Sequence, residues 1–346
     1  MGKISHYYFL FVSLSIISCD IEDPQIITVQ NGPPGIYVGG SDANGTAIWK
    51  DGTPTQLPGN GSGAQYIFVN GNDIYLAGKS YTGTGGNTNS FVYWKNGTSS
   101  TMLDLNAENF FSQLDGFTVS GNDLHAVWTQ NKGRNSFIKH WKNGVITSIT
   151  DSTHYAKSKS LFVYGQDVYI CGYESTGGIA VAKYWKNGKA FTLTDGKASA
   201  VANSMFVYQG DVYVAGMAST STDISKDITV ARYWKNSTGV DLTDKTKNAG
   251  ANSIFVNDEG IFVAGSEAVS TQSGYQVAKY WKNNVVSSLT NGALSGSAYQ
   301  ITVSDKDVYV VGKDAQFGTI WKNGIKLPPF DTNDPSILPL CISVIK

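Results

Sequence analysis

One short motif recurs along the whole of this chain: a tryptophan and a lysine followed by a turn dipeptide. Seven of the eight tryptophans belong to it, at spacings of 40 to 49 residues, namely Trp49, Trp94, Trp141, Trp185, Trp234, Trp281 and Trp321. A period of this length matches one four-stranded blade of a β-propeller, in which similar units stack around a ring. The repeat therefore constrains the fold more than any other feature of the sequence.

Each period contains four short apolar pieces, which are clearest at 204–207, 211–216, 230–234 and 240–243. They are separated by Gly, Asn, Asp and Ser, as expected of antiparallel strands and their turns. Asn-Gly after Trp-Lys favours a type I′ turn, so the last two strands of a unit should form a tight hairpin. A composition with 38 glycines, 19 tyrosines and only 15% charged residues agrees with an all-β chain.

The number of strands predicts how the ring closes. Counting from a strand at 36–40 to the end of the chain gives 28 strands, or seven groups of four. The last of them, Ile342–Val344, matches the innermost strand of a unit and would complete the blade begun by the N-terminus. Residues Ile27–Val29 fit the same place, although two prolines follow them, and we favour the C-terminal strand. The prediction is an all-β, seven-bladed β-propeller over residues 35–346, built from four-stranded antiparallel blades.

The first residues differ from the rest and predict export. Lys3 precedes an apolar run from Tyr7 to Ile17, which is a signal-peptide profile over residues 1–18. The run is too short for a membrane span, which needs roughly 20 apolar residues. It ends in Ile-Ile-Ser-Cys, which resembles the lipobox of bacterial lipoproteins and makes Cys19 the expected lipidation site. An ordinary secretory leader with a chance cysteine is the alternative.

Residues 19–34 would then form a lipidated, acidic tether. Asp20, Glu22 and Asp23 resemble the acidic export signal of surface lipoproteins, and a plain acidic spacer is an equal alternative. The expected location is the bacterial outer membrane, facing either the periplasm or the cell surface, with the membrane contacted through the lipid on Cys19.

The repeat unit is complete as Tyr-Trp-Lys-Asn-Gly at residues 93–97 and 184–188. In this it resembles propeller-forming repeat lipoproteins of bacteria that carry the same unit. The chain departs from the unit at His140, which replaces the tyrosine, and at Ser237 and Asn284, which replace the glycine. The resemblance implies an architecture and no established activity, because one fold hosts many functions.

The cysteines and histidines are expected to have structural rather than catalytic or metal-binding roles. Cys171 belongs to the fourth blade and Cys341 to the seam between the last blade and the first, so both should be free and buried. His125 and His140 occupy positions that carry Tyr or Phe in other repeats. We therefore expect them to be structural residues that pack within the blade, and call them the wall histidines. They and His154 lack the spacing of metal sites, and no nucleotide-binding motif is present, so no metal or cofactor is expected.

The two faces of the ring should differ. On one face the turns are short, with Asp73, Asp123, Asp167, Asp211 and Asp307 beginning the second strand of their units and Lys50, Lys95, Lys142, Lys186, Lys235, Lys282 and Lys322 ending the third. This predicts an inner acidic ring and an outer basic ring. A calcium site or a site for an acidic partner is the alternative, but Asp is a common turn residue and Lys protects hairpin edges, so a structural role is favoured.

The opposite face carries the segments that vary between repeats, where binding sites are usually built. Five aromatic residues are predicted to project from these loops: Trp128, Tyr173, Tyr81, Tyr275 and Phe317. Flanked by Asn, Ser and Thr, they suit stacking on sugar rings. Five carboxylates fall in the same segments, and two of them could form a catalytic pair if they converged: Glu174, Asp223, Asp227, Glu267 and Asp314.

The expected function is a non-catalytic, lipid-anchored recognition module that binds a glycan or an envelope protein. A polysaccharide-active hydrolase or lyase is the alternative, and a structural or adhesion protein is a third possibility. A formal charge of −1 gives no reason to expect nucleic acid as a partner. A closed ring without open edges needs no second subunit, so a monomer is expected.

Overall fold

The structure is a computed structural model, which describes residues 34–82, 88–105, 113–221, 227–328 and 336–345. The expected signal peptide, Cys19 and nearly all of the tether lie outside the described residues. So does Ile27–Val29, the rival candidate for the closing strand. No helix long and apolar enough to cross a bilayer occurs in the described part of the chain.

The described residues form 28 strands and no α-helix, in agreement with the predicted all-β class. The strands are β1 (Gly35–Asp42), β2 (Gly45–Lys50), β3 (Thr53–Gln56), β4 (Asn60–Asn70), β5 (Asp73–Thr82), β6 (Thr88–Lys95), β7 (Thr98–Asp104), β8 (Leu114–Ser120), β9 (Asp123–Lys132), β10 (Asn135–Lys142), β11 (Val145–Ser148), β12 (Tyr155–Tyr164), β13 (Asp167–Thr176), β14 (Ile179–Lys186), β15 (Lys189–Thr192), β16 (Ala200–Tyr208), β17 (Asp211–Ser219), β18 (Thr229–Lys235), β19 (Thr238–Asp241), β20 (Ala249–Asn257), β21 (Gly260–Ala268), β22 (Gln276–Lys282), β23 (Val285–Ser288), β24 (Gly296–Ser304), β25 (Asp307–Asp314), β26 (Phe317–Lys322), β27 (Ile325–Lys326) and β28 (Leu338–Ile345).

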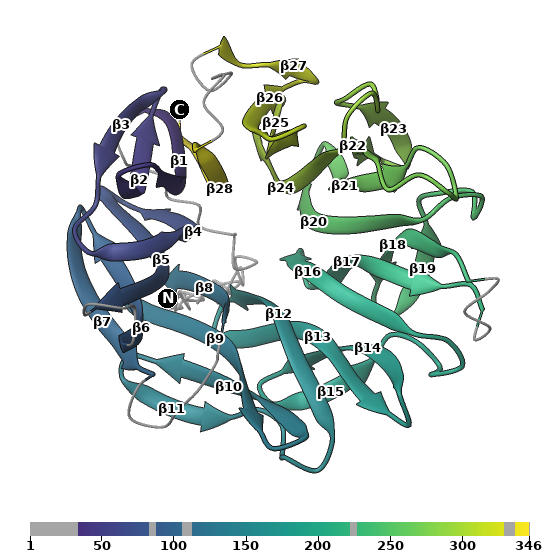
Figure 1. Cartoon of the computed structure of the whole chain (residues 1–346). Coiled ribbons are helices and arrows are strands. Elements are labelled where there is room, and N and C mark those ends of the chain that lie inside the picture. Colours follow the sequence, from purple (N-terminus) through teal and green to yellow (C-terminus); the bar gives the residue numbers. More distant parts are fainter. Residues whose placement is uncertain (1–33, 83–87, 106–112, 222–226, 329–335, 346) are drawn as a thin grey trace, which may run out of the picture.

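Most strands pair with their sequence neighbours into four-stranded antiparallel sheets. Five such sheets have the orders β28-β1-β2-β3, β4-β5-β6-β7, β16-β17-β18-β19, β20-β21-β22-β23 and β24-β25-β26-β27. The sheets follow one another around a ring, with the first strand of each order nearest the centre (Figure 1). The ring places the two ends of every sheet on two opposite faces, which we call the turn face (β4–β5 and β6–β7 turns and their equivalents) and the hairpin face (the β5–β6 turn and its equivalents).

The remaining strands form one eight-stranded sheet. It consists of two antiparallel meanders, β8–β11 and β12–β15, joined by a single parallel pair between Ser136 of β10 and Tyr155 of β12. The hydroxyl of Ser136 reinforces this link by donating to the carbonyl of Ala156 at 2.6 Å. Among the described strands, this is the one place where two neighbouring meanders share backbone pairing.

The C-terminal strand pairs with the first strand of the ring, as predicted. β28 runs antiparallel to β1, with Ile342 opposite Val38. On its other side β28 contacts the preceding sheet, where Gln300 Oε1 accepts the N–H of Ile342 at 2.9 Å. Ile342 also packs in one buried cluster with Tyr309 and Val311. The last segment of the chain thus holds the sheets at both ends of the sequence together.

The motif that defines the repeat is placed identically in every unit. The seven tryptophans lie on the third strand of their meanders and are at most 6% exposed. After each Trp-Lys pair both turn residues have positive φ, as type I′ requires, even at Asn236–Ser237 and Asn283–Asn284 where glycine is missing. The predicted tight hairpins are therefore confirmed.

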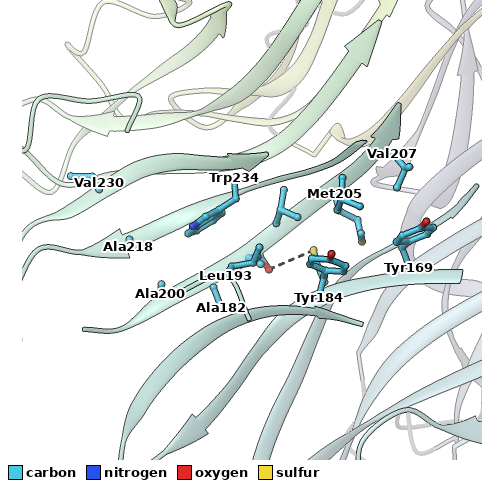
Figure 2. Close-up of a cluster of buried hydrophobic side chains, with 14 residues drawn as sticks. Tyr169, Ala182, Tyr184, Leu193, Ala200, Met205, Val207, Ala218, Val230 and Trp234 are labelled. Carbon is cyan, nitrogen blue, oxygen red and sulfur yellow. Dashed lines mark hydrogen bonds between the residues drawn. The ribbon is translucent and has the colours of Figure 1, made fainter. Parts of the chain in front are cut away.

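The core lies between neighbouring sheets rather than within one of them. Figure 2 shows Tyr184 and Leu193 of one meander beside Met205 and Trp234 of the next, in one cluster of buried side chains. Similar clusters join other neighbouring sheets around the ring. Burial on both faces explains why the inner strands are apolar on both sides instead of alternating.

Each innermost strand contains a β-bulge, and the unpaired residues are Leu340, Gln65, Asp115, Lys159, Asn203, Asn252 and Tyr299. Several of these side chains tie one innermost strand to the next. Asn203 donates to the carbonyl of Ala251 at 2.9 Å, and Asn252 donates to that of Ala298 at 2.8 Å. The bulges thus supply cross-links around the centre of the ring.

Both described cysteines are free and buried, as predicted. Cys171 Sγ lies 3.8 Å from the carbonyl oxygen of Ala202, and Cys341 Sγ lies 3.4 Å from that of Ala64, each in the next sheet. Burial raises the pKa of both thiols. They are small core residues that serve the packing between sheets.

Candidate functional site

The turn face carries a repeated arrangement of Asp, Lys and Asn. In the β12–β15 meander, Lys186 Nζ lies 2.7 Å from a carboxylate oxygen of Asp167 and 5.2 Å from the ring centre of Tyr169. Asn187 accepts the N–H of Val168 at 2.9 Å and donates to Asp167 at 2.7 Å. The same set recurs at Asp73–Lys95–Asn96, Asp123–Lys142–Asn143, Asp211–Lys235–Asn236 and Asp307–Lys322–Asn323.

This arrangement corrects the prediction of separate acidic and basic rings. Each aspartate that begins a second strand is paired within its own unit with the lysine that ends the third strand. No group of three or more His, Cys, Asp or Glu side chains suited to a metal occurs among the residues that the structure describes. On the turn face, ion pairs and hydrogen bonds thus hold the hairpins in place. This agrees with the structural role that the sequence favoured.

On the hairpin face, paired strand extends into several of the predicted loop segments. Residues 129–136 belong to β9 and β10, which pair from Lys142 opposite His125 to Asn135 opposite Lys132. Tyr173 lies within β13 and Tyr81 within β5. Trp128, Tyr173 and Tyr81 are therefore held by strand pairing, whereas Tyr275 lies just before the start of β22.

Trp128 is a core residue, contrary to the prediction that it projects from the hairpin face. Its side chain is 2% exposed and packs edge to face on Phe91, with ring centres 6.0 Å apart. In most units a glycine stands at this position, and a Cβ on Gly172 would lie 1.9 Å from the carbonyl oxygen of Lys157. On the inner side Trp128 is paired with Leu114, the first residue of β8, so the shorter inner strand leaves space that the indole fills.

The other predicted aromatics are spread over separate sheets. Tyr275 is 51% exposed beside β22, and Phe317 is half-buried at the start of β26. The side chain of Tyr81 lies outside the described part of the chain. No ring contact joins two of the predicted aromatics among the described residues. Among those whose side chains are described, Tyr173 is the one with an aromatic ring contact.

That partner is Tyr155, which the sequence did not single out. The two ring centres are 6.3 Å apart, with the planes tilted by 32°. Tyr155 is 36% exposed and Tyr173 is half-buried, so both offer ring surface to solvent. Backbone pairing of Tyr155 with Ser136 fixes the start of β12 and hence the position of this pair.

A buried polar network lies next to the tyrosine pair. Oδ2 of Asp115 accepts hydrogen bonds from Thr129 at 2.7 Å and from Ser158 at 2.6 Å. All three side chains are less than 9% exposed. Burial raises the pKa of Asp115, while the two hydroxyl donors and nearby lysines oppose that shift. The network ties β8, β9 and β12 together where the two meanders meet.

Two lysines flank this network on β12. Lys157 lies directly opposite Tyr173 in the strand register, and Lys159 is the unpaired bulge residue two positions further on. Burial, and then the charge of Lys157, lower the pKa of Lys159. We call the group Asp115, Thr129, Tyr155, Lys157, Ser158, Lys159 and Tyr173 the junction site, because it lies where β8–β11 joins β12–β15.

A cavity of about 260 Å³ lies between innermost strands, and one of its lining residues, Leu114, directly precedes Asp115 of the junction site. Its lining comes from four innermost strands and the residue before β8: Gln65, Tyr66, Gln113, Leu114, Tyr299 and Leu340. The hydroxyl of Tyr66 donates to the carbonyl of Leu114 at 3.3 Å. Oε1 of Gln65 is buried without a hydrogen-bond partner in the described structure. The centre of the ring thus offers an unused acceptor.

The structure describes four of the five predicted carboxylates and gives each a partner close by. Glu174 is ion-paired with Lys183, Glu267 with Lys279, and Asp314 with Lys326. Asp227 accepts the backbone N–H groups of Thr220 and Ser221 and so orders its own hairpin. Asp223 lies outside the described residues. Each of the four described carboxylates therefore has a local structural partner.

The two wall histidines contact each other, as their equivalence to paired aromatics suggests. Nδ1 of His125 and Nε2 of His140 are 3.0 Å apart, and the rings stack with centres 5.2 Å apart. Burial lowers the pKa of each to about 4, so both imidazoles are neutral at neutral pH. Their place is the core of the β8–β11 meander, on the side of the turn face.

Solved structures resemble this chain only in fold. The β-propeller domain of the Trilobed protease from Pyrococcus furiosus aligns with a TM-score of 0.54 and 9% identity, covering 87% of this chain and 95% of that domain. Acylaminoacyl peptidase from Pyrococcus horikoshii aligns with a TM-score of 0.52 and 9% identity over 87% of this chain. That alignment covers 52% of the peptidase, so the chain spans about half of its length.

These similarities, together with the ring of four-stranded antiparallel sheets, define the chain as a β-propeller. No family model matches it, and no curated protein does. At 9% identity, what the two peptidases act on is not transferred to this chain.

Proposed function

We propose that the 28 strands form seven four-stranded blades, with the eight-stranded sheet counting as two. The support is that β8–β11 and β12–β15 each repeat the meander order of the other sheets and share only one backbone pair. Each of them also contains its own Trp-Lys-Asn-Gly hairpin. On this count the blade made of β28 and β1–β3 closes the ring with strands from both ends of the chain.

The function that the site supports best is recognition of a ligand at the junction site on the hairpin face. The observation that carries this proposal is the Tyr155–Tyr173 pair, two partly exposed rings 6.3 Å apart on rigid strands. Exposed aromatic rings beside polar groups suit stacking against a sugar or a peptide, because they offer a large apolar contact at low entropic cost. The neighbouring Asp115 network fixes the strands that carry them.

Recognition is favoured over catalysis by the state of the carboxylates. A glycosidase needs two carboxyl groups about 5 to 10 Å apart that are available to the substrate. The described carboxylates on the hairpin face are held in ion pairs or turns, and Asp115 is buried behind hydroxyl groups. A hydrolase or lyase therefore has less support than a binding module.

The proposed location is the bacterial outer membrane, with the propeller tethered by a lipid on Cys19, as in the repeat lipoproteins that carry the Tyr-Trp-Lys-Asn-Gly unit. The support is the apolar run ending in Ile-Ile-Ser-Cys and the acidic residues after it. Incorporation of labelled fatty acid into the expressed chain tests the anchor. The label should be lost in Cys19→Ser, and its retention in that variant would place the lipid elsewhere.

Recognition itself is tested by thermal unfolding of the full chain carrying Cys19→Ser, against panels of saccharides and envelope proteins. A ligand at one hundred times its Kd stabilises the folded state by about 2.7 kcal/mol, which is readily measured. A saccharide-specific or protein-specific shift supports recognition. Unchanged melting curves across both panels would contradict it and favour a structural role.

A further inference from the structure

The junction site has an excess of positive charge that no described partner neutralises. The ammonium groups of Lys157 and Lys159 have no hydrogen-bond or ion-pair partner among the residues that the structure describes, although thirteen ion pairs occur elsewhere. Both lysines are half-buried, and the charge of Lys157 lowers the pKa of Lys159. Holding two cations together in this way costs free energy unless an anion joins them.

The nearest carboxylates do not supply that anion. Asp115 is buried, it is turned toward Ser158 and Thr129, and its raised pKa means that its surroundings disfavour its negative charge. Glu174, which follows Tyr173, is ion-paired with Lys183. Neither carboxylate forms an ion pair with Lys157 or Lys159, although the charge of Asp115 raises the pKa of Lys159 and so opposes part of the effect of burial.

The lysines and the tyrosines share one surface. Tyr155 and Lys157 are two positions apart on β12, which puts them on the same face of the sheet, and Tyr173 lies opposite Lys157 on the paired strand. Lys159 is the unpaired bulge residue two positions after Lys157 on the same strand. An aromatic platform is thus followed directly by two cationic groups.

We propose that the junction site binds an acidic saccharide, with a sugar ring against Tyr155 and Tyr173 and a carboxylate or sulfate group against Lys157 and Lys159. This inference rests on the proposed recognition role and adds the chemical class of the ligand. A saccharide fits better than an acidic polypeptide because the site pairs a flat apolar platform with charge at a short, fixed distance along one strand. Lysine acts here as a compact point charge that either a carboxylate or a sulfate satisfies.

The test uses matched ligand pairs that differ in charge alone. Isothermal titration of the full chain carrying Cys19→Ser compares oligogalacturonate with its methyl ester, and sulfated dextran oligosaccharides with unsulfated dextran. We expect at least one anionic ligand to bind at least tenfold more tightly than its neutral partner. Its affinity should also fall as sodium chloride is raised, because salt screens exposed charges.

Variants then locate the charge. Lys157→Gln combined with Lys159→Gln should lower the affinity for that anionic ligand at least tenfold, whereas Lys306→Gln, an exposed lysine on the turn face, should leave it unchanged. Unchanged melting temperatures would show that the variants fold. Both glutamine changes keep the length of the side chain approximately and remove only its charge.

Three results would overturn the inference. Equal affinity for charged and neutral saccharides would refute the acidic ligand and leave the recognition role standing. Preferential binding of poly-glutamate through the two lysines would point to a protein partner instead. Absence of binding by all anionic saccharides would reject the assignment, and the recognition role would then be decided by the envelope-protein panel.

Discussion

The hydroxyl of Ser158 on β12 donates to the carboxylate of Asp115 on β8 across 2.6 Å, and so joins two meanders at the centre of the ring. Neither residue belongs to an unusual sequence motif, and both are buried. The contact exists because Asp115 is the unpaired residue of a bulge, which turns its side chain out of its own strand ladder and toward the neighbouring one.

Replacing Asp115 with Ala should destabilise the fold by about 2–3 kcal/mol, because two buried hydroxyls lose a charge-assisted acceptor. Urea denaturation at neutral pH measures the change. The matched control is Asp195→Ala, which removes an exposed carboxylate and should change the free energy of unfolding by less than about 0.5 kcal/mol. Similar values for the two variants would show that the network adds nothing to stability.

Trp128→Ala should lower stability rather than ligand affinity alone. The indole is 2% exposed and fills space against Phe91, and truncating a buried tryptophan costs about 3–5 kcal/mol. Thermal and urea unfolding check this, with Tyr275→Ala as the exposed aromatic control. A variant as stable as the wild type would mean that Trp128 is not packed in the core.

The His125–His140 pair should make the protein sensitive to acid. Each folded-state pKa is lowered from near 6.5 to about 4, so the unfolded state binds more protons between these values. The stabilisation is complete above pH 6.5 and is lost as the pH falls toward 4, with a magnitude on the order of 3 kcal/mol for one histidine.

The matched variant is His125→Tyr with His140→Tyr, since the β4–β7 sheet carries Tyr75 and Tyr93 at these positions. Denaturation from pH 7 to pH 4 should show a smaller loss of stability in the double variant than in the wild type. Parallel curves for the two proteins would exclude the histidines as the origin of the acid sensitivity.

In the turn-face arrangement, the asparagine should matter more than the ion pair. Asn187→Ala removes the acceptor of the Val168 N–H and a side chain that tolerates φ of 49°, so we expect a loss of about 1–2 kcal/mol. Lys186→Gln breaks an ion pair that is more than a third exposed, which is worth less than about 1 kcal/mol. Equal losses in chemical denaturation would refute this ranking.

Much of the fold was predictable because the chain repeats itself. Trp94 and Trp185 recur with the same turn and the same strands, so a misreading of one unit is corrected by the others. The pairing of the C-terminal strand with β1 followed from counting strands, and the free cysteines followed from that placement. Features that are present in every repeat can be predicted without knowing which distant residues are in contact.

The site was less predictable because it is formed where one copy departs from the rest. Asp115, Tyr155 and Lys159 come from strands of two different units, and their approach depends on bulges and on the single bridge between β10 and β12. Trp128 was misplaced because it was assigned to a loop. It stands at a position that is glycine in other strands, and this was a signal of burial.

On the function proposed above, the Tyr155–Tyr173 pair is the recognition platform. Its most direct test is calorimetric titration of a ligand found in the binding panels into Tyr155→Ala, Tyr173→Ala and, as a control from another sheet, Tyr275→Ala. Loss of an aromatic contact at a binding site typically costs more than 1 kcal/mol, so we predict a loss of affinity of about tenfold in the first two variants and none in the third. Normal binding by Tyr155→Ala and Tyr173→Ala, with all three proteins folded, would contradict the account and place the binding surface elsewhere on the ring.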